Sequence, residues 1–165
     1  VSVTPNHQLF RNTPLSTRAN VAYFGAFGYE LNIAKLSEEE QEEIKKQVEF
    51  VKQYRGLIQK GTFYRLLSPF EGNIAAWIVV SEDKKDAIMG YYKILNDVNC
   101  PYRRLCLQGL DEKMEYTIEG VDGVYSGREL MKAGMITDPS AGQVLDGGET
   151  CTDFWSKIYL LHGEK

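Results

Sequence analysis

The sequence predicts a mainly β protein, in which an antiparallel β-sandwich follows a single strand–helix unit. Three observations support this fold class. A continuous apolar run over Val21–Gly28 precedes a long amphipathic stretch. After Gly61 the hydrophobic period changes from about 3.6 residues to about 2. Most of the 10 Tyr, 7 Phe and 2 Trp lie in the C-terminal two-thirds of the chain, and aromatic residues favour strands.

The first segment to be justified is the strand. Residues 1–20 are polar and irregular, with Pro5 and Pro14 as breakers of regular structure. Val21–Gly28 is short, apolar throughout and ends in glycine, which is typical of a strand buried on both faces, as in a parallel sheet. We therefore expect the first strand over these eight residues.

The helix that follows carries the clearest local signal in the sequence. Ser37 and Glu40 have the spacing of a capping box, so we expect a helix from about Glu38 to about Gln59. Apolar residues recur along it at steps of three and four: Ile44, Val48, Val51, Tyr54 and Ile58. One strand and one helix cannot close a core alone. We therefore expect the chain to be part of a larger enzyme, and its helix either to pack on the sandwich or to cause self-association.

The sandwich is predicted from short alternating segments separated by turn residues. The segments are Thr62–Leu67, Ala75–Ser81, Ala87–Leu95, Tyr102–Leu107, Glu115–Glu119 and Phe154–Leu161. Because Ala75–Ser81 is apolar on both faces, it should be a central strand. Gly120–Gly123 is interpreted as a turn, Glu129–Ala133 as a short helical turn and residues 137–150 as a loop.

Composition excludes several classes of protein. The net charge is −4 and no dense Lys/Arg run occurs, so we expect no nucleic-acid partner. No apolar stretch reaches the length of a membrane span, and no signal peptide is visible, so no membrane association is expected. The three cysteines form no CxxC pair, which favours reduced thiols and a cytoplasmic location.

Few residues are candidates for chemistry. His7 lies between the amides Asn6 and Gln8, an arrangement that can bind a hydroxylated ligand or act as an acid or base. The alternative is a loop histidine bonded to backbone. His162 has no partner spacing to His7, so we expect no metal site, and no motif indicates a cofactor.

Paired carboxylates, as glycoside hydrolysis requires, are not evident. Nearly all the aspartates fall in predicted turns, where aspartate is common. They are Asp83, Asp86, Asp97, Asp111, Asp122, Asp138, Asp146 and Asp153. Four strand aromatics could stack on sugar rings or belong to the core: Trp77, Tyr91, Tyr92 and Trp155. A non-catalytic module that binds carbohydrate or a protein partner is therefore kept as an alternative.

A wider resemblance links these segments. Val1–Gln8, Thr13–Arg18 and Phe24–Leu31 resemble the end of the catalytic barrel of family thirty-six α-galactosidases. The similarity continues through Tyr64–Phe70, Ala76–Trp77, Gly90–Tyr92, Arg104–Leu110, Tyr125–Met131 and Asp153–Phe154. The resemblance implies that residues 1–60 end a catalytic (β/α)₈ barrel and that residues 61–165 form a C-terminal antiparallel sandwich. Val21–Gly28 would be the last barrel strand and Ser37–Gln59 the last barrel helix.

The resemblance also implies a function. The family is expected to hydrolyse terminal α-galactosides such as melibiose and raffinose with retention, using two aspartates whose motifs are absent here. We therefore assign no catalytic residue, expect the pair to precede Val1 and predict that the chain alone is inactive. Asn6 and His7 would lie at the substrate rim. The expected partners are a galactoside and the missing barrel, and a homo-oligomer is left open.

Overall fold

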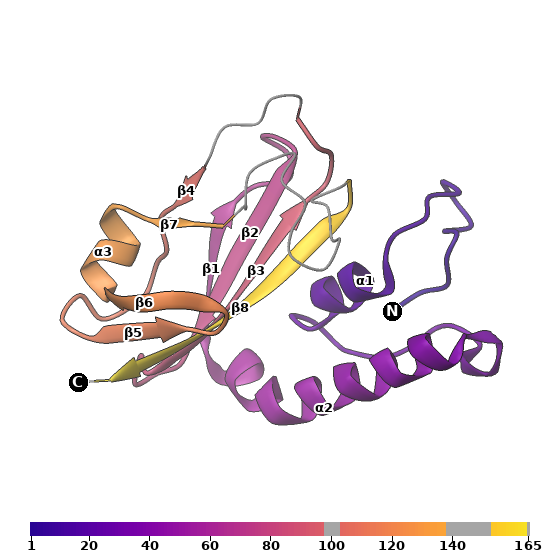
Figure 1. Cartoon of the computed structure of the whole chain (residues 1–165), viewed down its shortest axis with the longest axis horizontal. Helices are drawn as coiled ribbons and strands as arrows, with labels where there is room; N and C mark the ends of the chain where they lie inside the picture. The colour runs from indigo at the N-terminus through magenta and orange to yellow at the C-terminus, as the bar shows by residue number, and fades with distance from the viewer. Residues whose placement is uncertain (98–102, 138–152, 165) are drawn as a thin grey trace.

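The computed structural model describes residues 1–97, 103–137 and 153–164. Helices α1 and α2 lie on one side of an antiparallel sheet, and the short helix α3 lies on the other (Figure 1). The helices are α1 (Leu15–Ala22), the 3₁₀ helix η1 (Ile33–Lys35), α2 (Glu38–Lys60) and α3 (Gly127–Lys132). The strands are β1 (Thr62–Leu67), β2 (Ile74–Val80), β3 (Asp86–Lys93), β4 (Arg104–Leu105), β5 (Glu115–Ile118), β6 (Val121–Ser126), β7 (Met135–Ile136) and β8 (Trp155–Glu164).

Helix α2 confirms the prediction made from its cap. The Ser37 hydroxyl accepts a hydrogen bond from the Glu40 amide at 3.2 Å, and the Glu40 carboxylate accepts one from the Ser37 amide at 3.0 Å. Two of the donors left unpaired at the start of the helix are thereby satisfied. The helix ends at Lys60, one residue later than expected, and the Gly61 amide donates to the Leu57 carbonyl.

The strand predicted over Val21–Gly28 is wrong. Its first two residues end α1, and the rest form turns. The apolar residues that α1 and its C-cap bury are Leu15, Ala19 and Tyr23, at 6%, 0% and 7% exposure, and their spacing of four is that of a helix face. Pro14, interpreted as a breaker, occupies the N-cap of α1, because proline at the very start of a helix removes no intrahelical hydrogen bond.

Residues 1–61 contain no assigned strand, and their only β pairing is a single bridge. Ser2 and Glu30 form an isolated parallel bridge, and the Glu30 amide donates to the Val1 carbonyl at 2.9 Å. Parallel pairing with a helix between the partners is the pattern of a βαβ crossover. The segment therefore has the character of a parallel-barrel end, as the fold class requires, with α1 as the crossover and α2 after the second strand position.

The main sheet has six antiparallel strands in the order β1-β2-β3-β8-β5-β6, and β4 pairs with β7 in a second small sheet. Strand β2 lies between β1 and β3, which confirms its predicted central position. Strand β6 was missed because Gly120–Gly123 was interpreted entirely as a turn. The turn consists of Glu119 and Gly120, with Gly120 at φ 71°, and β6 begins at the next residue.

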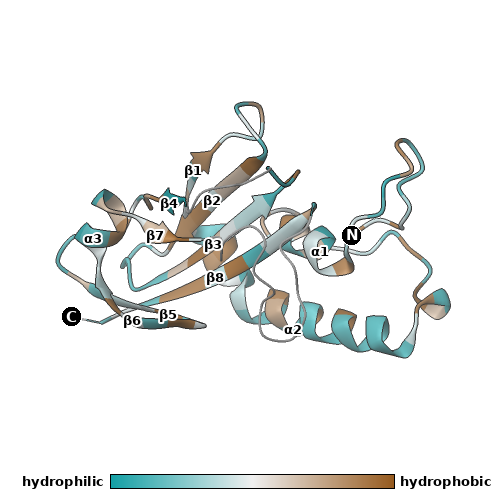
Figure 2. Cartoon of the chain, turned by 45° about the horizontal axis from the view of Figure 1, so that its top comes forward, coloured by the Kyte–Doolittle hydropathy of each residue, from teal (hydrophilic) through white to brown (hydrophobic). Residues whose placement is uncertain are grey.

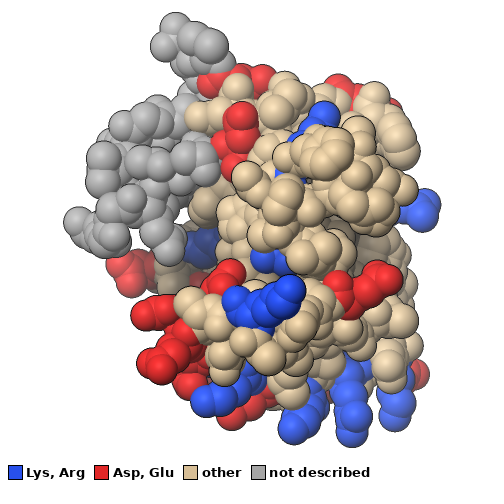
Figure 3. Space-filling view, turned by 90° about the vertical axis from the view of Figure 1, so that its right-hand side faces the viewer, with Lys and Arg blue, Asp and Glu red and all other residues tan. Residues whose placement is uncertain are grey.

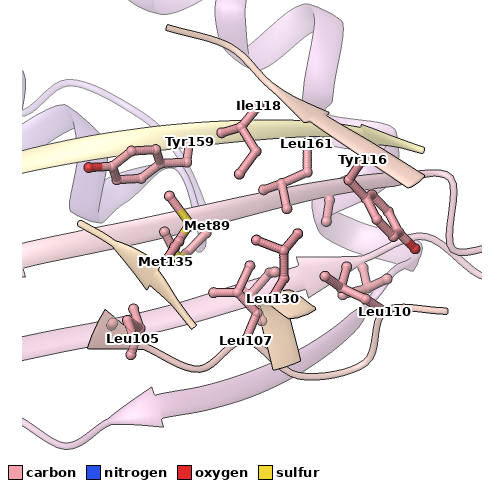
Figure 4. Packing of buried hydrophobic residues seen from close by; sticks show 14 of the residues in the cluster. Met89, Leu105, Leu107, Leu110, Tyr116, Ile118, Leu130, Met135, Tyr159 and Leu161 are labelled. Carbon is pink, nitrogen blue, oxygen red and sulfur yellow. The ribbon is translucent and has the colours of Figure 1, made fainter. Parts of the chain in front are cut away.

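The hydrophobic core lies between the main sheet and the layer made by β4, β7 and α3 (Figure 4). Five of its large side chains have no exposed area: Ile78, Met89, Tyr116, Leu130 and Leu161. Burying each of them contributes on the order of 2 kcal/mol. Hydrophobic residues are concentrated on the strands, whereas most of α2 is hydrophilic (Figure 2).

Hydrogen bonds between polar groups join α1 to the sheet. Thr17 donates to the Phe154 carbonyl at 2.7 Å, and its hydroxyl lies 2.8 Å from that of Ser156. The Asn20 amide group also donates to Ser156, and the Tyr92 hydroxyl donates to the Asn20 carbonyl. Contacts of α2 with β2 and β3 add to this junction, so the expected packing of the helix on the sandwich is observed. No described helix is both long and apolar enough to cross a membrane.

Candidate functional site

The candidate site lies at the end of the two segments that the isolated parallel bridge pairs, where the chain leaves each segment to form a loop. Ser2 and Glu30 run parallel, so the loops that follow them, residues 4–14 and 31–37, leave from the same edge. In barrels of parallel strands this edge is the one that carries the substrate-binding loops. Both predicted rim residues, Asn6 and His7, lie in the first of these loops.

Asn6 organises the first loop. Its side-chain oxygen accepts hydrogen bonds from the amides of Gln8 at 2.9 Å and Leu9 at 3.1 Å. Its backbone carbonyl accepts from Phe10 and its amide donates to Arg11. Asn6 thus closes residues 6–11 into a turn through its side chain and its backbone. No partner for the Asn6 Nδ2 group is found among the described residues, which leaves two donors available to a ligand.

His7 is exposed at this turn, and no hydrogen bond of its ring is found in the part of the chain that the structure describes. The second histidine is elsewhere, on β8, where His162 lies 2.9 Å from Asp86 and 3.1 Å from Glu119. The hydrogen bond to Asp86 raises the pKa of His162, burial opposes that effect, and Glu119 adds to it. The structure therefore does not bring the two histidines together.

Arg18, a residue that the sequence did not single out, fastens the base of the first loop. Its guanidinium donates to the carbonyls of Ser2 and Thr13. These two residues lie at the start and at the end of the loop. Burial lowers the pKa of Arg18, and the carboxylates of Glu40 and Glu43 oppose that shift. Arg18 also lines a cavity of about 340 Å³ between the two loops, together with Val3, Thr4, Leu31, Asn32, Lys35, Leu36 and Glu40.

Several of the described aspartates have structural partners. Asp83 accepts from the Ser81 hydroxyl and the Lys85 amide, and these hydrogen bonds lower its pKa. Asp111 accepts from the Lys113 amide in the next turn. These contacts are typical of turn aspartates, as the sequence indicated. Asp138 and Asp146 lie outside the described residues.

The four aromatic residues considered for sugar binding do not form an open surface. Tyr91 and Tyr92 are 1% and 5% exposed. Trp77 packs on Tyr92 with ring centroids 4.4 Å apart, and Trp155 meets the edge of Tyr91 at 6.2 Å. Aromatic pairs at these separations stabilise a core. The two tyrosines therefore belong to the interior, whereas half-buried Trp77 lines an apolar cavity together with Phe63 and Phe70.

A metal site is not found either. Within residues 1–97, 103–137 and 153–164, no group of three or more His, Cys, Asp or Glu side chains is arranged to hold a metal ion. The first loop offers amide and imidazole hydrogen bonding, and the cavity between the loops adds the charged side chains of Arg18, Lys35 and Glu40.

Comparison with known families agrees with a barrel end followed by a sandwich, the architecture of a glycoside hydrolase. Residues 74–161 match the model of the glycosyl hydrolase family 36 C-terminal domain, and residues 1–61 match the melibiase model. The first match alone covers more than half of the chain. The chain belongs to glycosyl hydrolase family 36.

Individual relatives give the same result. Alpha-galactosidase AgaA of Geobacillus stearothermophilus is 54% identical over 135 residues, which are 82% of this chain and 18% of that protein. The solved structure of an AgaA variant with raffinose has a TM-score of 0.89 at 46% identity, over 99% of this chain and 21% of that one. The α-galactosidase of Lactobacillus brevis gives 0.90 at 42% identity. This chain spans about a fifth of the length of its relatives.

Proposed function

We propose that this chain is the C-terminal part of a retaining α-galactosidase that hydrolyses terminal α-galactosides of the melibiose and raffinose type. The observation that carries the proposal is the pair of family matches, one ending at residue 61 and the other beginning at residue 74. Relatives are named as α-galactosidases, and solved structures of AgaA variants contain raffinose and stachyose. Those substrates fit a loop edge that offers neutral hydrogen-bonding groups.

The reaction would be a double displacement through a galactosyl-aspartate, with a second carboxyl group as acid and base. This chain lacks both aspartate motifs, so the proposal places the carboxylates in the four-fifths of the relatives' length that the chain does not span. The chain would contribute loop 4–14 to the rim, with Asn6 and His7 donating to sugar hydroxyls, while the sandwich holds the end of the barrel.

A chimera tests the proposal. Residues 1–165 replace the matching region of Geobacillus AgaA, and turnover of raffinose and of α-galactosyl fluoride is measured. We expect the chimera to hydrolyse both and to release α-galactose first, as NMR would detect. AgaA cut before the matching region, and the 165-residue chain alone, should be inactive. Turnover by the chain alone, or an inactive but folded chimera, would contradict the proposal.

We also propose that the protein acts in the cytoplasm. The support is Cys106, a free and exposed thiol in the described part of the chain, because such thiols persist in reducing compartments. Fractionation of cells producing the native gene, followed by detection of the chain, would test this location.

A further inference from the structure

Strand β6 contains a pair of residues that have no partner on the neighbouring strand. The pairing of β5 with β6 sets Thr117 opposite Val124 and Ile118 opposite Val121. Asp122 and Gly123 therefore form a bulge on β6 that has no counterpart on β5. Both residues are exposed. The main chain of this bulge is thus less constrained than that of a regular strand, and water reaches it.

Asp122 and Gly123 are an aspartate followed by a glycine, the sequence in which aspartate isomerises most readily. In that reaction the backbone nitrogen of the second residue attacks the carboxyl carbon of the aspartate, and a cyclic imide forms. Glycine favours the attack because it carries no β-carbon and adopts backbone conformations that other residues rarely adopt. Gly123 has φ 106°, which is one of these conformations. The bulge therefore presents both reacting groups with little steric hindrance.

The side chain of Tyr125 contacts the same peptide group. Its hydroxyl donates a hydrogen bond to the Asp122 carbonyl at 2.7 Å. That carbonyl is conjugated with the Gly123 nitrogen. When the nitrogen loses its proton, negative charge moves partly onto the carbonyl oxygen, where a hydrogen-bond donor stabilises it. Tyr125 therefore assists the step in which the nitrogen becomes a nucleophile.

The bulge lies away from the part of the enzyme that this chain lacks. The main contacts of α1 and α2 with the sheet are to β2, β3 and β8, whereas the helix that β6 contacts is α3. Residues 1–61, which match the melibiase model, form much of the side that faces the viewer in Figure 3. Strand β6 lies toward the opposite end of the molecule (Figure 1). The exposure of Asp122 and Gly123 is therefore not that of a surface left open next to residues 1–61.

We propose that Asp122 is a site of spontaneous modification, at which aspartate is converted to isoaspartate through an imide with Gly123. The Gly123 nitrogen forms a bond to Cγ of Asp122, and the carboxyl hydroxyl group leaves as water with the amide proton. Water then opens the imide at the former main-chain carbonyl of Asp122, which becomes a free carboxylate, and the chain continues through Cγ. Water is released in the first step and consumed in the second, so no other reactant is needed. The inference does not rest on the proposed function.

We expect the modified chain to stay folded. Isoaspartate lengthens the main chain by a carbon atom, and the unpaired bulge can absorb this change without shifting the pairs of Tyr116 with Tyr125 and of Glu115 with Ser126. The new carboxylate stays at the exposed bulge. The partner that fits it is a protein carboxyl methyltransferase specific for isoaspartate, acting on β6.

The test is incubation of the 165-residue chain, and of the chimera with AgaA, at pH 5.5 and 37 °C, followed by tryptic digestion. Cleavage after Lys113 and Arg128 leaves Asp122 as the only aspartate in the peptide 114–128. The isoaspartyl peptide separates by chromatography at unchanged mass, and electron-transfer fragmentation identifies it. We expect isoaspartate and its imide to accumulate at Asp122 in both proteins, and faster than at the other described aspartates, none of which precedes a glycine.

Variants separate the effect of the fold from that of the sequence. Tyr125→Phe keeps the ring but removes the donor, and it should slow isoaspartate formation about threefold, as the loss of a modest hydrogen bond predicts. In guanidinium chloride this difference should disappear. Asp122→Glu should give no product at this position, because its longer side chain would have to close a larger ring. Tyr64→Phe, on β1 at the other end of the sheet, is the matched control and should not change the rate.

Three outcomes would overturn the inference. Isoaspartate could be absent from peptide 114–128 of the folded chain while it forms in guanidinium chloride, which would show that the fold protects Asp122. Tyr125→Phe could react as fast as Tyr64→Phe, which would remove the role of the hydroxyl group. The modified chain could also lose the circular dichroism of the folded one, which would show that the bulge does not absorb the longer main chain.

Discussion

Thr17 is the residue on which the junction between the helices and the sheet most depends. It is 8% exposed, and its hydroxyl contacts both the Phe154 carbonyl and the Ser156 hydroxyl. Thr17→Val keeps the shape but leaves the Phe154 carbonyl without this donor, so we expect a loss of about 1–3 kcal/mol in the free energy of unfolding. Urea denaturation followed by circular dichroism measures it. Thr62→Val, at an exposed position on β1, should change stability by less than about 0.5 kcal/mol.

His162 makes stability depend on pH. Its folded pKa is raised mainly by Asp86, so the protonated ring stabilises the fold fully below the unfolded pKa of about 6.5. That contribution is lost as the pH rises through the folded pKa. Because the side chain is 42% exposed, solvent screening limits it to about 0.5 kcal/mol.

We therefore expect His162→Gln to lower thermal stability at pH 5.5 and to have a smaller effect at pH 8.5. In an Asp86→Asn background the difference between the two pH values should shrink. A His162→Gln effect that grows with pH would contradict the assignment.

At the scale of elements, α2 gives the simplest prediction. Ser37→Ala removes the acceptor for the Glu40 amide, which should cost about 1 kcal/mol and lower Tm by about 3 °C. Scanning calorimetry provides the measurement. Ser16→Ala, at an exposed position inside α1, should have little effect or a slightly stabilising one, because alanine is the better helix former there. Equal losses in both variants would show that the cap is not responsible.

The helices and strands also show which sequence signals were sufficient to predict secondary structure. The cap of α2 and the continuous apolar run of β2 are local patterns, and the structure confirms both. Helix α1 is short and starts after a proline, and most of it lies within residues 1–20, which were interpreted as irregular. The pairing of Ser2 with Glu30 joins segments 28 residues apart and has no local signal.

The same limit applies to the candidate site. Asn6 and His7 were found because an amide–histidine–amide sequence is chemically conspicuous. Arg18 was missed because its role depends on carbonyl groups at Thr13 and Ser2, which no side-chain pattern reveals. The positive φ of Phe10 in the first loop was missed because it contradicts the intrinsic preference of a bulky residue, and only the closed turn explains it. Whether Asn6 and His7 contact substrate stays a prediction.

At the scale of the whole molecule, the fold class could be predicted because the change of hydrophobic period at Gly61 separates helical from extended segments. The way in which the helical segment is attached to the sheet could not be predicted. The junction includes single hydrogen bonds between α1 and β8, such as that from Asn20 to Ser156, whose two residues are more than 130 positions apart in the chain. The division at residues 60 and 61 likewise stays a prediction.

The position of β8 has a consequence for the order of events during synthesis. Its partners β3 and β5 both precede it in the chain, so they leave the ribosome with unpaired inner edges and wait for residues 155–164. Unpaired edges are sites of aggregation, and pairing over such sequence distances is slow. Ser156, which binds α1, arrives on the same strand. We therefore expect the sheet to close and the hydrogen bonds between α1 and Ser156 to form together at a late stage, whereas the contacts of α1 and α2 with β2 and β3 can form earlier.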